Sequence, residues 1–241
     1  MNLNDLSTQL LFTTLPIWVQ SEDGRVSTGT CFIFSFVDPE DSDKTIPFIV
    51  TNYHVIKNEE KNFIPNKAVI QFIKRKGNEP DLNDTVRVEV DPNYLVRQPD
   101  IENDLTAAPI GPILNNLQDQ NIPVFFRAIT PDLIPDDQTI NDFGAIEEIT
   151  FIGYPSGIFD QKNNIPIVRN GITATPIWNH FGGDFRFLID AGVFPGSSGS
   201  PVFILNQGTY RKGNSVVVGS RILFLGVLSQ SLLRNEDKNK S

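Results

Sequence analysis

Short apolar segments separated by turn-forming residues run through almost the whole chain of 241 residues. Each segment is rich in Val, Ile, Phe and Thr, and Gly, Pro, Asn or Asp separates it from the next. Runs of about four to eight such residues are typical of antiparallel β-strands and too short for most helices. The segments expected as strands are 14–20, 30–36, 47–51, 68–73, 85–90, 123–128, 146–152, 165–168, 185–189, 201–205, 215–218 and 222–228.

Little of the remaining chain has a helical pattern. Leu6 and Leu10 lie four residues apart, which predicts one short helix within residues 3–11 with Asn4 as its N-cap. The polar stretch 115–121 is expected to join two halves of one folded unit, because all-β proteins of 200–250 residues often form a single domain.

Composition and charge exclude several classes of protein. Hydrophobic residues make up 39% and charged residues 20%, as in a folded globular chain. A net charge of −9 opposes nucleic-acid binding, and the sequence contains no apolar run long enough to span a membrane. The first residues lack the basic stretch of a secretory signal, so we expect a cytoplasmic protein. Cys31 is the only cysteine, which excludes an intrachain disulfide and a cysteine-based zinc site, and we expect it in the core.

The most informative segment is 191–201, in which Ser197 and Ser198 stand between two glycines. Glycine permits backbone dihedrals that turn consecutive N–H groups into one small cavity. A serine beside such a cavity fits an acyl-transfer nucleophile, because the N–H groups would stabilise an oxyanion. A Gly/Ser turn between strands explains the same pattern, so this segment alone leaves both interpretations open.

A serine nucleophile needs a base, and the chain contains two histidines. His54 follows the apolar segment 47–51, at the end of an expected strand. His180 lies in a glycine-rich segment with no apolar run leading into it, and we interpret it as structural. His54 is therefore the candidate base.

The third group must be a carboxylate that orients the imidazole. Asp104 is the best candidate because the apolar residues after it would bury it, and Asp100 is the alternative. The resulting order is His, Asp, Ser. An α/β-hydrolase would need a histidine after Ser198, and none follows. The subtilisin order places an aspartate before the histidine and a helix after the serine, whereas Pro201 and the apolar residues after it predict a strand.

With these residues in this order, the sequence resembles the trypsin-like peptidases, most closely their bacterial Deg/HtrA-type branch. The resemblance extends from about residue 28 to about residue 230 and rests on several segments in the family's order. These segments are 29–34, 51–55, 104–106, 153–157 with 171–174, and 195–201.

The resemblance implies an all-β fold of two packed six-stranded antiparallel β-barrels, with the active site in the crevice between them. Residues 12–115 would form the first barrel, 122–232 the second and 233–241 a polar tail. The implied activity is that of a serine endopeptidase, and the implied substrate is a polypeptide.

The resemblance also assigns roles to individual residues. His54 and Asp104 from the first barrel and Ser198 from the second would form the catalytic triad. The N–H groups of Gly196 and Ser198 would form the oxyanion hole.

Substrate specificity follows from the family position six residues before the serine, which is Gly192. No acid stands there to bind Arg or Lys, and Val193, Val227 and Leu228 would line an apolar pocket. We therefore expect cleavage after small or medium apolar residues. The backbone of Gly226, Val227 and Leu228 would pair with the substrate as an added strand.

The sequence departs from the family in a few places. Ser197 stands where secreted trypsins have the aspartate that receives a freed N-terminus, so that activation switch is absent. Ser200 replaces the usual glycine, and the residues after Gln230 are too few for a PDZ domain. We expect no cofactor and no metal, and we expect control by a regulatory protein partner or by the way the substrate is presented. The alternatives are a catalytically inactive trypsin-like domain that binds peptides or proteins, and an esterase with the same triad.

Overall fold

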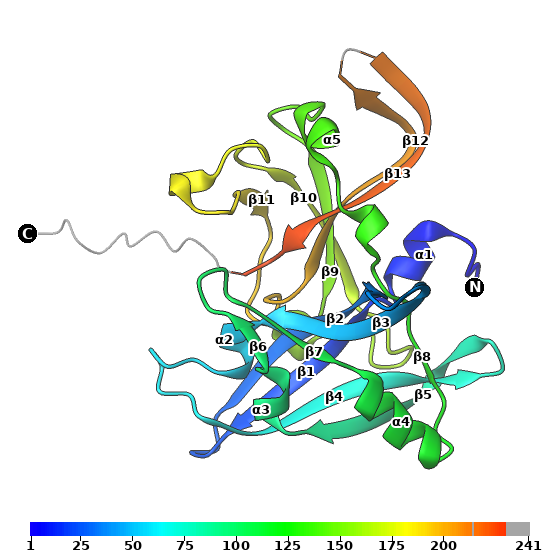
Figure 1. Ribbon diagram of the computed structural model, residues 1–241, viewed down its shortest axis with the longest axis vertical. Coiled ribbons are helices and arrows are strands. Elements are labelled where there is room, and N and C mark those ends of the chain that lie inside the picture. The colour runs from blue at the N-terminus through cyan, green and yellow to red at the C-terminus, as the bar shows by residue number, and fades with distance from the viewer. Residues whose placement is uncertain (214, 230–241) are drawn as a thin grey trace, which may run out of the picture.

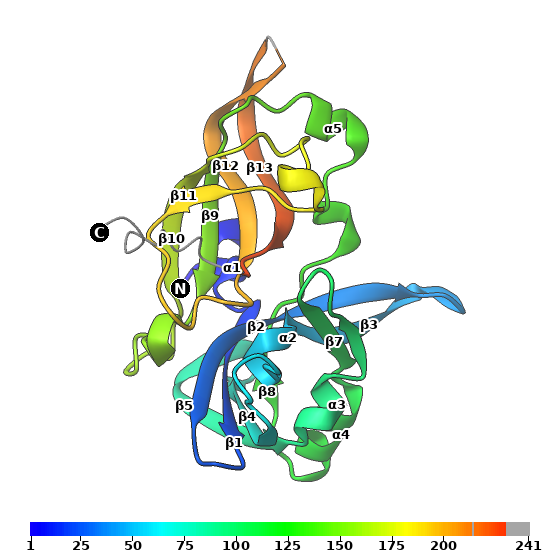
Figure 2. The same ribbon diagram turned by 90° about the vertical axis from the view of Figure 1, so that its left-hand side faces the viewer.

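The computed structural model describes residues 1–213 and 215–229, which form two antiparallel sheets (Figure 1). The strands of the first sheet are β1 (Thr14–Ser21), β2 (Val26–Asp38), β3 (Asp41–Asn52), β4 (Pro65–Lys76), β5 (Glu79–Val90), β6 (Gln98–Asp100), β7 (Leu105–Pro109) and β8 (Val124–Phe125). Those of the second sheet are β9 (Glu148–Gly153), β10 (Ile167–Thr173), β11 (Ile189–Ala191), β12 (Pro201–Lys212) and β13 (Ser215–Val227). The two sheets form two lobes, one above the other (Figure 2).

The order of the first sheet is β5-β4-β1-β2-β3-β7-β6 with β8 paired to β4, and that of the second is β11-β10-β9-β12-β13. The predicted all-β class with two antiparallel sheets is confirmed. The expected six strands in each barrel become eight and five, and strand pairing among the described residues does not close either sheet on itself. In the second sheet, the N–H of Phe181 donates to the carbonyl of Arg186, so these residues form a turn and the strand expected at 185–189 lies instead at Ile189–Ala191.

Several strands are longer than their apolar segments. The segments 215–218 and 222–228 belong to one strand, because β13 stays paired with β12 through Gly219. β7 was not expected, since its sequence contains two alanines and a proline, yet it pairs with β3 along its whole length. β8, expected to open the second half of the chain, pairs with β4 of the first sheet instead.

Helices are short and lie at the ends of strands. They are α1 (Leu6–Leu10), α2 (Tyr53–Ile56), α3 (Pro92–Leu95), α4 (Gly111–Asp119) and α5 (Asp137–Asn141), with 3-10 turns at Pro131–Leu133, Pro155–Gly157 and Phe181–Gly183. The first helix confirms the prediction, but its N-cap is Asp5 and not Asn4, because the Asp5 carboxylate accepts a 2.9 Å hydrogen bond from the N–H of Thr8. α4 occupies part of the stretch expected as a connection, since Ile113 and Leu117 are one helical turn apart and both are buried.

The larger apolar core fills the first sheet. Cys31 belongs to it, as predicted, and its thiol donates a 3.4 Å hydrogen bond to the carbonyl of Leu15. Burial raises the pKa of this thiol far above its usual range. Cys31 is therefore a packing residue with little thiolate character.

A second apolar cluster joins the two sheets. Phe32 and Phe34 of β2 pack against Phe203 of β12 and Phe224 of β13. The ring of Phe224 lies 5.6 Å from that of Phe32 and 5.7 Å from that of Phe203, measured between centroids. Aromatic pairs at this separation add to the free energy gained from burial. This cluster fixes how β2 lies on the second sheet.

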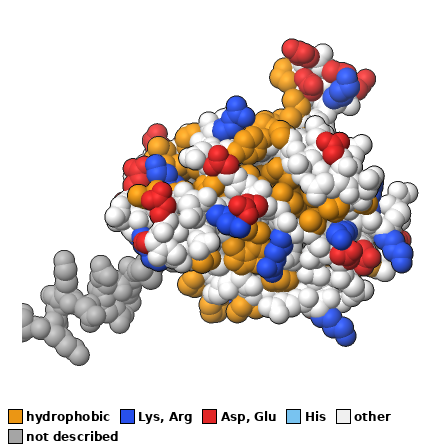
Figure 3. Space-filling view, turned by 90° about the horizontal axis from the view of Figure 1, so that it is seen from below, with side chains coloured by type: hydrophobic (Ala, Val, Ile, Leu, Met, Phe, Trp, Pro, Cys, Tyr) orange, Lys and Arg blue, Asp and Glu red, His pale blue; other side chains and the backbone are white. Residues whose placement is uncertain are grey.

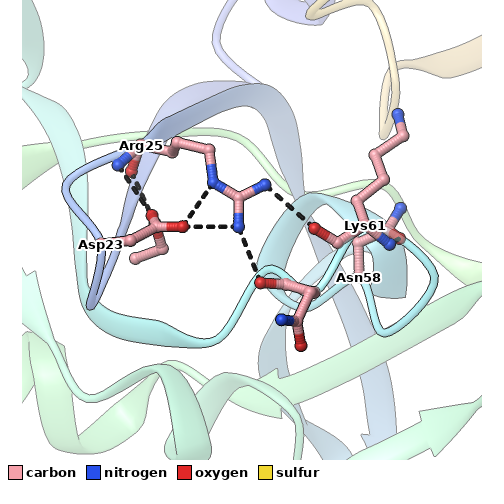
Figure 4. A network of polar contacts seen from close by, with 6 residues as sticks. Asp23, Arg25, Asn58 and Lys61 are labelled. Atoms are coloured by element: carbon pink, nitrogen blue, oxygen red, sulfur yellow. Dashed lines mark hydrogen bonds and ion pairs between the residues drawn. The ribbon is translucent and has the colours of Figure 1, made fainter.

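A polar network holds the loop after α2 (Figure 4). The guanidinium of Arg25, in the turn that leads into β2, pairs with Asp23 at 2.7 Å. It also donates to the carbonyl oxygens of Lys61 at 3.0 Å and Asn62 at 2.7 Å. The end of the loop that follows His54 is thus tied to the first sheet.

Basic and acidic side chains are interspersed on the face seen in Figure 3, around a strip of hydrophobic side chains. Within residues 1–213 and 215–229, no helix has the length and apolar character needed to cross a membrane.

The cluster between the sheets predicts a large loss of stability in Phe203→Ala. Phe203 is fully buried, so its truncation should lower the free energy of unfolding by about 3–5 kcal/mol. Val218→Ala is the control, because that side chain is 84% exposed and its loss should cost less than about 0.5 kcal/mol. Urea unfolding measures both, and similar values for the two variants would contradict the importance of this cluster.

Candidate active site

His54 lies in α2, immediately after β3 ends at Asn52. Val55 and Ile56 of the same turn are buried in the core of the first sheet. Because successive helical residues point in different directions, burying these two turns the imidazole of His54 toward solvent, where it is 31% exposed. The apolar sequence around His54 thus sets the direction of its ring.

Asp104 lies in the turn between β6 and β7, with a left-handed backbone at φ 55°. Aspartate tolerates this conformation better than most residues. Its carbonyl accepts hydrogen bonds from the N–H of Tyr53 at 3.1 Å and from the side chain of Asn52 at 2.9 Å. Its carboxylate accepts one from the N–H of His54 at 2.9 Å. The turn is therefore bound to the start of α2, where backbone N–H groups have no helical partner.

The structure brings Asp104, and not Asp100, to the imidazole. Oδ2 of Asp104 lies 2.6 Å from Nδ1 of His54. The carboxylate of Asp100 instead accepts hydrogen bonds from the backbone and side chain of Asn103, at 3.1 and 2.8 Å. Asp100 thus stabilises the turn that presents Asp104.

Ser198 stands on the other side of the imidazole, three residues before the buried start of β12. Its Oγ lies 3.0 Å from Nε2 of His54. With Nδ1–H directed at Asp104, Nε2 carries the lone pair that faces the hydroxyl. The three side chains predicted from the sequence therefore form one continuous row of hydrogen bonds.

Two glycines allow the serine loop to approach its neighbours. Gly199 has φ 85°, and a Cβ there would lie 1.9 Å from the carbonyl oxygen of Thr30. Gly196 also has φ 85°, and a Cβ there would lie 2.4 Å from the nitrogen of Ser156. Any larger residue would move the loop away from β2 or from the turn after β9.

The N–H groups of Gly196 and Ser198 have no hydrogen-bond acceptor among the described residues, whereas those of Ser197, Gly199 and Ser200 have one. Neighbouring donors left free beside a serine hydroxyl can bind a negatively charged oxygen. These are the two groups that the resemblance assigns to an oxyanion hole.

The sequence profile described as Trypsin-like peptidase domain matches residues 29–210, which include all three side chains. The chain belongs to the trypsin-like peptidase family. No protein of curated function matches it at a significant level.

Solved structures with a similar fold include several proteases. An HtrA-type protease with a tripeptide is 15% identical, with a TM-score of 0.45 over 92% of this chain and 59% of that chain. A protease from M. tuberculosis in its active form is 13% identical, with a TM-score of 0.42 over 92% and 79% of the two chains. An inactivated protease paralogue from the scabies mite is 14% identical, with a TM-score of 0.36 over 88% and 90%. Since these scores are below 0.5, family membership rests on the sequence profile.

The environment of Asp104 favours its charged form. Burial alone would raise the pKa of the carboxyl, but hydrogen bonds from the side chains of His54 and Ser229 and from the N–H of His54 outweigh it. The net result is a pKa below the ordinary aspartate value. A negative charge thus faces Nδ1 throughout the neutral pH range.

Ser229 is a site residue that sequence reasoning missed. Its hydroxyl donates a 2.6 Å hydrogen bond to Oδ2 of Asp104, and its carbonyl lies 3.1 Å from Oγ of Ser198. It follows directly after the predicted substrate strand, but nothing in its sequence context distinguishes it from other serines. The contact exists because the end of β13 passes between segments from both sheets.

Ser200, the departure from the usual family glycine, fits without displacing the loop. It is fully buried, and its hydroxyl donates a 3.3 Å hydrogen bond to Oγ1 of Thr30. A Cβ at Gly153 of β9 would lie 2.0 Å from this hydroxyl. The additional side chain therefore occupies space that a glycine on the neighbouring strand leaves open.

The predicted substrate-binding residues lie on two segments of the second sheet. Gly192 and Val193 lie just before the serine loop, and Val193 packs against a small apolar cluster that includes Leu228. Gly226 and Val227 end β13, an edge strand whose one partner among the described residues is β12. These placements leave their roles as predictions.

His180 lies apart from this site. It precedes the 3-10 turn Phe181–Gly183, and its ring packs edge-on against that of Phe185 with centroids 5.1 Å apart. In the part of the chain that the structure describes, no group of three or more His, Cys, Asp or Glu side chains is arranged to hold a metal ion.

The close approach at Gly199 predicts that Gly199→Ala destabilises the protein more than Gly24→Ala. Gly24 has nearly the same φ, 86°, but open space around it. Alanine at Gly24 should therefore cost about 1–2 kcal/mol of unfolding free energy from backbone strain alone. Gly199→Ala should cost more, because its Cβ would overlap the Thr30 carbonyl. Equal losses in urea unfolding would contradict a tight contact between β2 and the serine loop.

Proposed function

We propose that this trypsin-like peptidase is an active serine endopeptidase, with Ser198 as nucleophile, His54 as base and Asp104 as the group that orients the imidazole. The observation that carries the proposal is the row of contacts from Asp104 to Nδ1 at 2.6 Å and from Nε2 to Ser198 Oγ at 3.0 Å. Both distances are within hydrogen-bond range, so the hydroxyl proton of Ser198 has a direct path to Nε2 while Asp104 holds the imidazole in place.

In the first half of the reaction, Oγ of Ser198 attacks the scissile carbonyl carbon while Nε2 of His54 takes the hydroxyl proton. The imidazolium that forms is stabilised by the carboxylate of Asp104, whose lowered pKa keeps it charged. General base catalysis of this kind contributes about 10²–10⁴-fold to the rate.

The carbonyl oxygen becomes negatively charged in the tetrahedral intermediate. The free N–H groups of Gly196 and Ser198 are the donors we assign to it. Loss of one such donor typically costs about 3 kcal/mol of transition-state stabilisation. Gly196 has φ 85°, a left-handed backbone that glycine adopts without steric cost.

Collapse of the intermediate breaks the carbon–nitrogen bond, and the proton on Nε2 passes to the leaving amine. Water then repeats the sequence on the acyl-enzyme. Nε2 takes a proton from the water, the acid product leaves, and the proton returns to Oγ of Ser198. The reaction consumes one water and needs no metal or cofactor step.

An extended polypeptide fits this site better than a compact substrate. β13 is an edge strand, and its end at Gly226 and Val227 lies two residues from Ser229, which contacts both Asp104 and Ser198. A substrate paired to that edge would place a peptide bond beside the nucleophile, and main-chain pairing would tolerate many sequences.

Labelling with a fluorophosphonate probe tests the nucleophile. We expect one covalent adduct per wild-type chain and none on Ser198→Ala, read by intact mass. Ser197→Ala is the matched control, because the hydroxyl of Ser197 is buried and has no hydrogen-bond partner among the described residues. This variant keeps Ser198 and should form the same adduct as the wild type.

The same samples separate the alternatives. A folded wild-type protein that gives no adduct would support the inactive binding domain instead. An adduct together with ester hydrolysis, but without cleavage of an unfolded protein, would support the esterase.

The role of Ser229 gives a further prediction. Removing its hydroxyl in Ser229→Ala takes one hydrogen bond from the Asp104 carboxylate and should slow probe labelling about tenfold, a typical effect for a bond to a charged group. Ser229→Thr keeps a hydroxyl and should restore most of the rate. An unchanged rate in Ser229→Ala, or equal losses in both variants, would show that the hydroxyl does not support Asp104.

A further inference from the structure

We propose that Arg169 is a specificity-determining residue of the primary substrate pocket and directs cleavage to peptide bonds that follow glutamate or aspartate. This inference rests on the proposed peptidase function, because it names the substrate side chain that precedes the bond attacked by Ser198. It arises from a contact between β10 and the segment before the serine loop.

The position of Arg169 in the second sheet directs its side chain toward the interior. Arg169 pairs with Phe151 of the neighbouring strand β9, and paired residues of antiparallel strands project to the same face. Phe151 is buried in the cluster with Val202 and Leu228. The carbonyl of Leu228 accepts a 2.9 Å hydrogen bond from the N–H of Gly199, so this face lies next to the serine loop.

The guanidinium of Arg169 reaches the segment predicted to form the pocket. Nη1 donates a hydrogen bond to the carbonyl oxygen of Gly192, the residue six positions before Ser198. The guanidinium carbon lies 4.1 Å from the ring centroid of Phe194. Because Gly192 has no side chain, nothing attached to it separates the charge from the pocket; even a Cβ there would lie 3.4 Å from Nη1.

No carboxylate among the described residues lies within ion-pair distance of Arg169. Asp190 of β11 pairs with Ile172, which projects to the opposite face of β10 from Arg169. The Nε–H of Arg169 is buried without a hydrogen-bond partner. The described protein thus provides this cation with a ring face and one carbonyl, and no neutralising charge.

A substrate carboxylate would provide that charge. Arg169 is half-buried, so its guanidinium remains accessible to a substrate side chain. A guanidinium and a carboxylate form strong, directional hydrogen bonds. A lysine or arginine in the pocket would be repelled, and an apolar side chain would leave the cation without a neutralising charge.

This inference differs from the sequence prediction of cleavage after small or medium apolar residues. That prediction considered Gly192, Val193, Val227 and Leu228, which lie near the serine along the chain or were assigned to the pocket by resemblance. Arg169 enters the pocket from a strand 23 residues before Gly192. The two hypotheses therefore differ in whether the charge of Arg169 or the apolar lining selects the substrate.

Peptidyl diphenyl phosphonates test the preference without requiring turnover. We would compare four that are identical except for a Glu, Gln, Val or Arg side chain at the position before the phosphonate. Glu and Gln have nearly the same shape, so their rate ratio measures charge. We expect Glu to inactivate the full chain about 10–100-fold faster than Gln, with Val slower than Glu and Arg slowest, as for a hydrogen-bonded charge pair.

Variants of Arg169 separate charge recognition from support of the loop. In Arg169→Gln the Glu/Gln rate ratio should fall toward one, and in Arg169→Lys a preference for Glu should persist. Arg211→Gln is the matched control, because the guanidinium of Arg211 donates to the carbonyl of Gly213 in the β12–β13 hairpin and not to the pocket segment. That variant should keep the wild-type ratio.

The outcomes distinguish this inference from the proposed function. Equal rates for Glu and Gln, or fastest reaction with Val, would overturn the acidic preference while leaving Ser198 as an active nucleophile. If Arg169→Gln slowed all four reagents equally, Arg169 would support the loop and not select the substrate. Labelling by the simple fluorophosphonate but by none of the four would also overturn the inference. Failure of every reagent, including that probe, would instead contradict the proposed peptidase function.

Discussion

Thr30 of β2 joins the two sheets at the point where the candidate catalytic residues meet. Its N–H donates a 2.9 Å hydrogen bond to the carbonyl of Ser198, and its carbonyl accepts one of 2.7 Å from Thr51, near the end of β3. Its hydroxyl oxygen accepts a 2.9 Å bond from the N–H of Tyr154, which directly follows β9 of the second sheet. One buried residue thus connects the strand that leads to His54 with the loop that carries Ser198. Because such buried groups are costly to leave unpaired, these contacts fix the two sheets relative to each other.

Apolar packing surrounds the hydrogen bonds of Thr30 and helps them to hold the two sheets together. Phe32, two residues after Thr30, is almost fully buried against the second sheet, where it meets Phe224. Burial of these rings favours close approach of the sheets, and the hydrogen bonds then select one register. Glycine at position 199 permits the final contact, since any Cβ would displace the Thr30 carbonyl. Apolar packing and hydrogen bonds therefore stabilise the same contact, the one between β2 and the serine loop.

Two charged groups at this site, Asp104 and Arg169, differ in how far neighbouring groups compensate their charge. Asp104 is partly buried, and three donors compensate the loss of water, so its pKa falls instead of rising. Arg169 has no such compensation from an acid among the described residues. A chain with a net charge of −9 would attract cations in general, so a preference for an acidic side chain would have to arise from this local cation and not from the long-range field.

The sequence by itself determined the β class, most strand positions and the order of His54, Asp104 and Ser198. These follow from local patterns, because strand formation depends on nearby apolar and turn-forming residues. The sequence favoured Asp104 and left Asp100 as the alternative, and only the structure decided which of these two carboxylates reaches the imidazole, since they lie four residues apart. Only the structure showed that Ser229 contacts the carboxylate of Asp104. Only the structure showed that the guanidinium of Arg169 reaches the segment before Ser198. Such contacts join segments far apart in the chain, and only the packing of one sheet on the other determines which side chains meet.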